Sequence, residues 1–154
     1  MAKSIDHVEK LVELLAKHEE IIGELYEQYE KRFPNFPLWK KLVRDEKHHA
    51  QWIRSFLHQT NFSGLSINLK IFSEKQIQHS IDHIKGQIKR AHQDSLYGAI
   101  NNAHRIETMV VENRVLHVFV SKNERVVKKI SSLQKATEHH ADLVYQELRK
   151  FETA

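Results

Sequence analysis

Two short stretches of the sequence share a histidine pattern that could hold a metal. In "DEKHHAQ", residues 45–51, Glu46 stands three residues before His49. "ATEHHAD", residues 136–142, aligns with it so that His140 matches His49, but Thr137 stands where the acid would be. Residues three apart lie on one helix face, so a glutamate and a histidine at this spacing can reach the same ion. Carboxylates suit hard cations, and imidazole suits iron, manganese or zinc.

A further glutamate precedes each histidine motif at a similar distance along the chain. Glu19 comes before the first motif and Glu107 before the second. Glu19 falls in the apolar row of its predicted helix, whereas Glu20 does not. Buried acids are costly unless a cation or a proton neutralises them. A salt bridge inside a helical bundle is the alternative interpretation of Glu19 and Glu107, and a hydrogen-bonded core histidine is the alternative for His140.

The elements that must position these residues are long helices. Apolar residues at alternating steps of three and four predict a helix over residues 4–33 and a second over 38–59. Two prolines in "FPNFP" separate them, and Pro37 suits the first turn of the second helix. The apolar row of the second helix comprises Trp39, Leu42, Glu46, His49, Ile53 and Phe56. Two adjacent members of this row, Glu46 and His49, are polar.

The middle of the chain predicts a long crossover. Residues 65–71 alternate apolar and polar, which is typical of an extended segment. No other segment was identified as a partner strand, so we expect a strap across the bundle that could pair in a dimer. Ser73 with Gln76 forms a capping-box pattern that opens a shorter helix with Ile77, Ile81, Ile84 and Ile88 on one side.

Two more long helices are predicted in the second half. One extends over about residues 94–120, and the other opens at a capping-box pattern of Ser121 and Glu124. The apolar row of the last helix comprises Val126, Ile130, Leu133, Thr137, His140, Val144 and Phe151. His79 and His83, four apart on the crossover helix, are interpreted as exposed residues.

Composition limits the class of protein. The 154 residues contain only 4 glycines and 2 prolines, which favours long helices in one domain over residues 1–154. Cysteine is absent, which excludes disulfides and thiolate metal sites. We expect a cytoplasmic protein, because no apolar run suits a membrane span and the N-terminus lacks the pattern of a signal peptide. The net charge of +4 is interspersed, so nucleic-acid binding is not favoured.

The motifs "HEEIIGELYEQY", "DEKHHA", "AINNAHRIET" and "EHHADL" resemble the ferritin-like superfamily, in particular rubrerythrin-type di-iron proteins. The resemblance implies an all-α, up-down four-helix bundle with a long crossover carrying an extra helix. It also implies iron, held as a pair or as a single ion, with manganese or zinc as alternatives. Carried over residue by residue, the ligands are Glu19, Glu46, His49, Glu107 and His140.

Iron oxidation or peroxide reduction is the chemistry that the resemblance implies. Since the chain has no cysteine-rich module, electrons for peroxide turnover would come from an external donor. A homodimer is expected.

The chain departs from the family pattern at two positions. Thr137 replaces a bridging acid, and Glu138 is turned about 100° away around the helix. Arg114, seven residues after Glu107, could neutralise a core acid in place of a metal. These departures lead to the hypothesis of reduced metal content: one ion, a weak pair or a salt-bridge network. The alternative function is a degenerate, non-catalytic bundle that serves as an interaction or structural protein.

Overall fold

A computed structural model of the chain describes residues 2–60, 65–68, 73–109, 112 and 115–153. The long elements are helices: α1 (Ala2–Arg32), α2 (Pro37–Thr60), α3 (Glu74–Arg90), α4 (Leu96–Thr108) and α6 (Glu124–Glu152). Two 3-10 turns, η1 (Ala91–Gln93) and η2 (Val115–Val118), and two short strands, β1 (Leu65–Ile67) and β2 (Phe119–Ser121), complete the described elements. The prediction of a helical protein is confirmed.

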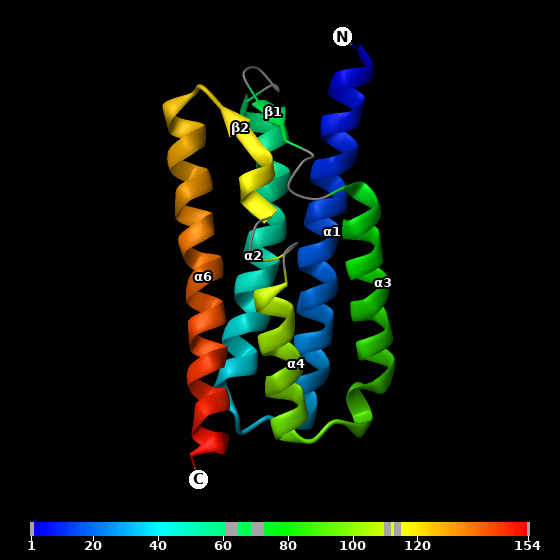
Figure 1. The fold of residues 1–154 in the computed structure, drawn as a ribbon, viewed down its shortest axis with the longest axis vertical. Helices are drawn as coiled ribbons and strands as arrows, with labels where there is room; N and C mark the ends of the chain where they lie inside the picture. Colours follow the sequence, from blue (N-terminus) through cyan, green and yellow to red (C-terminus); the bar gives the residue numbers. More distant parts are fainter. Residues whose placement is uncertain (1, 61–64, 69–72, 110–111, 113–114, 154) are drawn as a thin grey trace.

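The helices lie side by side along the long axis of the molecule (Figure 1). α1 and α2 form one antiparallel pair, and α4 and α6 form another. α3 packs on the outer side of α1 and returns the chain from one end of the molecule to the other. As a result, α2 and α4, which precede and follow α3 in the sequence, run in the same direction. The interior between the two pairs collects residues from both halves of the sequence.

The first helical pair follows the sequence prediction closely. Pro37 is the first residue of α2, where the missing N–H of proline costs nothing. Tyr26, Tyr29 and Trp39 are fully buried, as predicted for core aromatics. The Trp39 ring lies 5.8 Å from the ring centroid of Tyr26 and 4.9 Å from that of Tyr29. These aromatic contacts fix α1 against α2 just beyond the histidine motif.

The crossover helix α3 begins at the predicted capping box. The Ser73 hydroxyl accepts a hydrogen bond from the Gln76 amide at 3.3 Å, and the Gln76 side chain accepts one from the Ser73 amide at 2.7 Å. Ile77, Ile81 and Ile84 are buried against the core, whereas His79 and His83 are exposed as expected. α3 and α4 are separate helices, and Ser95 caps the second of them.

The prediction of a helix over 94–120 was wrong, because α4 ends at Thr108. Residues 119–121 instead form β2, which pairs antiparallel with β1, Ser66 opposite Val120. The expectation that the chain supplies no partner strand was therefore also wrong. The valines in this stretch explain the difference, since β-branched side chains lose freedom in a helix and fit a strand. Residues 69–71 of the predicted extended segment lie outside the described residues.

Two details of the last helix also differ from prediction. Its cap is Asn123, whose side chain accepts from the amides of Arg125 at 3.0 Å and Val126 at 3.5 Å. Ser121 belongs to β2 and cannot take that place. The buried row continues from Val144 to Leu148, which is 6% exposed, rather than to Phe151, which is 41% exposed.

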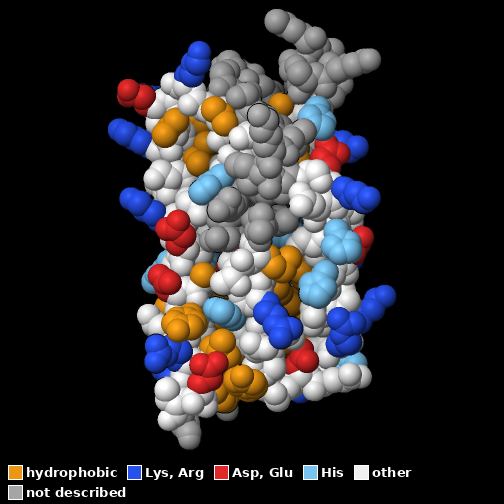
Figure 2. All heavy atoms as spheres, viewed as in Figure 1, with side chains coloured by type: hydrophobic (Ala, Val, Ile, Leu, Met, Phe, Trp, Pro, Cys, Tyr) orange, Lys and Arg blue, Asp and Glu red, His pale blue; other side chains and the backbone are white. Residues whose placement is uncertain are grey.

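The surface carries mixed charge. On the face shown in Figure 2, lysine, arginine and acidic side chains are interspersed, and several histidines lie among them. This agrees with a solvated surface rather than a single basic patch. Among the described residues, no helix combines the length and apolar character needed to cross a membrane.

Candidate metal centre

The five side chains predicted as metal ligands lie together in the interior of the bundle. All five are at most 6% exposed: Glu19, Glu46, His49, Glu107 and His140. α1 supplies the first, α2 the next two, α4 the fourth and α6 the last. Their sequence neighbours His48, Glu138 and His139 are exposed, as the helical spacing predicted. Glu20 is half-buried and pairs with Arg54 at the surface instead of entering the core.

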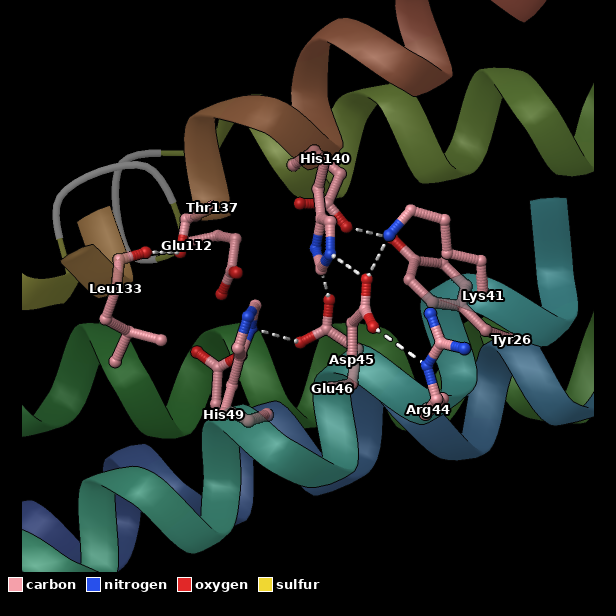
Figure 3. Close-up of polar contacts among 12 residues, drawn as sticks. Tyr26, Lys41, Arg44, Asp45, Glu46, His49, Glu112, Leu133, Thr137 and His140 are labelled. Carbon is pink, nitrogen blue, oxygen red and sulfur yellow. Dashed lines mark hydrogen bonds and ion pairs between the residues drawn. The ribbon is translucent and has the colours of Figure 1, made fainter. Parts of the chain in front are cut away.

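Glu46 is the central carboxylate of the α2 and α6 side of the site (Figure 3). One of its oxygens lies 3.1 Å from Nδ1 of His140, and the other lies 3.5 Å from Nδ1 of His49. Nδ1 of His49 is also 3.7 Å from a Glu19 oxygen. The two imidazole rings stack with centroids 4.9 Å apart. α1 lies close to α2 here, since a Cβ added at Gly23 would be in van der Waals contact with Cβ of Glu46 at 3.4 Å.

Glu107 enters the site from α4. Its Oε1 accepts a 2.7 Å hydrogen bond from the Tyr26 hydroxyl, while its Oε2 is buried without a hydrogen-bond partner. Tyr26 thus orients the carboxylate and leaves one oxygen turned to the other acids. Tyr26 therefore both packs in the core and positions Glu107.

Two further residues, His18 and Glu112, belong to the site and were not predicted. Both are fully buried. Nδ1 of His18 lies 3.6 Å from a Glu112 oxygen, and its Nε2 lies 2.8 Å from the Ser80 hydroxyl on α3. The crossover helix is therefore in direct contact with the centre through Ser80.

Helical geometry explains why these two residues escaped prediction. His18 is one residue from Glu19, about 100° around the helix, but α3 covers that side of α1 and buries it. Glu112 would lie about 140° from Glu107 on a continuous helix, but α4 ends at Thr108 and Glu112 is buried. Two features of the sequence could have pointed to these residues. One is the polar Ser80 beside Ile81 on the apolar face of α3, and the other is the pair of valines before Glu112, which disfavours a continued helix.

Burial and mutual repulsion act on the acids. Burial, together with the charges of Glu46 and Glu112, raises the pKa of Glu107 well above its usual range. Burial and the neighbouring Glu19 raise the pKa of Glu112 to about 7. The pKa of Glu19 is also raised, by burial first and by Glu46 second. Burial and the neighbouring carboxylates thus favour the protonated form of these three acids, as expected for carboxyl groups that are taken out of water and crowded together.

Glu46 and its two histidines behave as an ion-pair network. Burial pushes the pKa of Glu46 upward, but the contacts with His140 and His49 more than offset this and lower the pKa to about 2. Burial opposes protonation of His49, yet Glu19 and Glu46 raise its pKa to about 11. Glu46 likewise raises the pKa of His140 against the effect of burial. A metal cation in this position would neutralise the Glu46 carboxylate in place of the protons on the two histidines.

The donor atoms are arranged as a cation would require. Among the described residues, three groups of ligand atoms each fit within 4.8 Å: Glu46, His49 and His140; His18, Glu19 and Glu112; and Glu46, Glu107 and Glu112. Ligands held at about 2.1 Å from one ion are themselves about 3 Å apart, close to the 3.1–3.7 Å separations seen here. Several donor atoms are buried without a hydrogen-bond partner: His18 Nδ1, Glu19 Oε2, Glu46 Oε2, His49 Nδ1, Glu107 Oε2 and both Glu112 oxygens. The residues present therefore fit a metal.

Thr137, which prompted the hypothesis of a depleted site, is buried but turned to its own helix. Its hydroxyl donates to the Leu133 carbonyl at 3.1 Å. Another buried carboxylate, Glu112, belongs to two of the three groups of possible ligand atoms. Arg114, the second basis of the hypothesis, lies outside the described residues.

No protein-family model matches the chain, and neither a curated protein nor a solved structure shows significant similarity to it.

Proposed function

We propose that the protein binds iron or a similar divalent metal within its helical bundle. The observation that carries the proposal is the set of buried carboxylate and imidazole atoms that face one another without hydrogen-bond partners. A buried polar atom left unpaired costs free energy, and a metal ion would satisfy several at once. The mixture of carboxylate oxygens and imidazole nitrogens suits iron or manganese, with zinc as the alternative.

The arrangement of helices supports assignment to the ferritin-like type. Two antiparallel pairs joined by a crossover that spans the bundle are characteristic of that type. The first-helix glutamate Glu19 and the Glu46–His49 pair occupy the corresponding positions of the first half. Glu107 and His140 stand at the corresponding positions of the second half.

Iron oxidation or peroxide reduction is the reaction class proposed for this centre. A bound redox-active metal would supply the electron transfer to the oxidant. The chain's own residues hold the ion, exclude bulk water through burial, and fix Glu107 through the proton that Tyr26 donates to it. Repeated turnover would need an external electron donor, because the sequence contains no cysteine and hence no thiolate redox centre.

A second candidate is a structural bundle that binds no metal. It is favoured by the ion pairs of Glu46 with His49 and His140, which neutralise part of the buried charge without a cation. It accounts for Glu112 through the ion pair with His18 at 3.6 Å, but it does not account for Glu107, whose unpaired Oε2 has no lysine or arginine partner among the described residues.

Metal binding by the purified protein separates the two candidates. The protein would be loaded anaerobically with Fe(II), desalted and measured for bound iron by elemental analysis, followed by oxidation with oxygen or peroxide. Retention of iron by the wild type, with strong loss in His49→Ala and in Glu46→Gln, is the expected result. His48→Ala is the matched control, since His48 is the exposed neighbour. A wild-type protein that retains no iron, manganese or zinc would overturn the proposal.

A further inference from the structure

We infer that the centre has two separate cation positions, the second formed by His18, Glu19 and Glu112. This inference rests on the proposed metal-binding function and extends it to residues outside the repeated glutamate-histidine motif. Glu112, which follows the early end of α4, supplies the acid that Thr137 does not. The result is a pair of divalent ions in place of the single or weakened site that Thr137 suggested.

The two positions adjoin each other and use different residues, with His49 Nδ1 of the first 3.7 Å from a Glu19 oxygen of the second. The group of Glu46, His49 and His140 shares no residue with the group of His18, Glu19 and Glu112. A third group, Glu46, Glu107 and Glu112, takes one residue from each and adds Glu107. Carboxylates have two oxygens and can therefore contact two cations at once. Glu46, Glu107 and Glu112 thus stand between the two positions as candidate bridges.

The charge of the site also matches two ions. Four buried glutamates face one another there: Glu19, Glu46, Glu107 and Glu112. With the histidines neutral, as metal ligands must be, the ionised carboxylates carry four negative charges. Two divalent cations would balance all four, whereas a single ion would balance two and leave the other two acids to be neutralised by protons.

The surroundings of His18 allow the tautomer that metal binding needs. The Ser80 hydroxyl lies 2.8 Å from Nε2 and can accept its proton, which leaves the Nδ1 lone pair toward Glu112. His140 has the same arrangement, with Asp45 at 3.0 Å from Nε2 and Glu46 beside Nδ1. An outer hydrogen bond of this kind is the usual companion of a ligating histidine. His18 is therefore held like His140 rather than like a packing residue.

The unpaired atoms at the second position point to a ligand. Both oxygens of Glu112 and Nδ1 of His18 are fully buried and have no hydrogen-bond partner. The separation of 3.6 Å between His18 and Glu112 exceeds a hydrogen bond but suits two donors on one ion. A role limited to packing would not place a glutamate here.

Manganese titration tests the second position. Wild-type protein freed of metal would be titrated with Mn(II), with bound ions counted by equilibrium dialysis and spin coupling between neighbouring ions observed by electron paramagnetic resonance. We expect two ions per chain and a coupled signal in the wild type. Glu112→Gln and His18→Ala should each bind one ion with an uncoupled signal. His139→Ala and Glu138→Gln, which change exposed residues near the site, should keep two.

The possible failures are distinguishable. Two coupled ions in folded Glu112→Gln and His18→Ala would overturn the second position. A wild type that binds one ion, lost in His49→Ala but kept in Glu112→Gln, would overturn it while leaving the proposed function intact. A wild type that binds no ion would overturn both. Circular dichroism confirms that each variant is folded, and Ser80→Ala offers a milder change that should weaken the second ion and spare the first.

Discussion

At the scale of single residues, the histidines of the centre share one orientation. His18, His49 and His140 each turn Nδ1 toward a buried carboxylate. For His18 and His140 an outer oxygen, from Ser80 or Asp45, lies at hydrogen-bond distance from Nε2. Outer partners of this kind keep the ring and its tautomer in place before an ion arrives. If the proposed centre binds a metal, its affinity should therefore depend on residues that do not contact the ion.

Asp45 provides the clearest test of this dependence. Asp45→Asn should lower metal affinity about 10- to 100-fold, because a neutral amide holds the His140 tautomer less firmly. Isothermal titration with Mn(II) would measure the change. Lys41→Gln is the control, since it removes the exposed 2.7 Å ion pair to Asp45 without touching His140. Equal loss of affinity in both variants would assign the effect to the surface ion pairs instead.

At the scale of elements, the early end of α4 decides which acid completes the centre. A helix continued past Thr108 would carry Glu112 away from Glu107, whereas the observed break brings both carboxylates into one group. α6 meanwhile presents Thr137 three residues before His140, the position at which a glutamate would share its helix face. In the proposed centre, the segment after α4 therefore supplies a carboxylate that α6 does not.

Moving the acid back tests this interpretation. The double variant Glu112→Gln with Thr137→Glu should recover the two ions per chain that Glu112→Gln alone loses. The physical reason is that a glutamate at position 137 lies on the same face of α6 as His140. Mn(II) dialysis of the single and double variants gives the comparison. A double variant that still binds one ion would show that the backbone near Thr137 cannot bring a carboxylate to the metal.

The sequence predicted the helices with strong periodicity and the polar residues that lie on their buried faces. Glu19, Glu46, His49, Glu107 and His140 are buried as the steps of three and four predicted, and their role as metal ligands stays a prediction. His18 and Glu112 were not found, since each depends on a tertiary arrangement: the packing of α3 against α1, and the break after α4. The pairing of β1 with β2 is likewise long-range, and three-residue strands carry little pattern.

At the scale of the whole molecule, the centre makes stability depend on pH. In the metal-free protein, Glu112 keeps its proton up to a pKa of about 7, whereas in the unfolded chain it loses the proton near its ordinary value of 4.5. Its stabilising contribution is therefore complete below pH 4.5 and lost as the pH rises through 7. The contribution of His49, whose pKa is raised to about 11, is complete below 6.5 and declines above it. Both groups therefore lower the free energy of unfolding as the pH rises from 5 to 8.

The free energy of unfolding of the metal-free protein should accordingly fall from pH 5 to pH 8. Urea denaturation in the presence of a chelator would measure it, and Glu112→Gln should show a smaller fall. The lowered pKa values of Asp45 and Glu46, about 2 each, act only in more acidic solution and do not affect this interval. With saturating metal the trend should reverse, because ligands must lose their protons to bind. Metal-free stability that rises from pH 5 to pH 8 would contradict the assignment of these pKa values.

The spread of the centre along the chain has a kinetic consequence. Its donors extend from His18 to His140, so neither helical pair contains a complete set. An ion can bind tightly only after both pairs have docked, which places metal binding late in folding. Interactions absent from the folding transition state slow unfolding rather than speed folding. The ion would therefore act as a lock on the assembled bundle: it lengthens the lifetime of the native state and leaves the rate of folding almost unchanged.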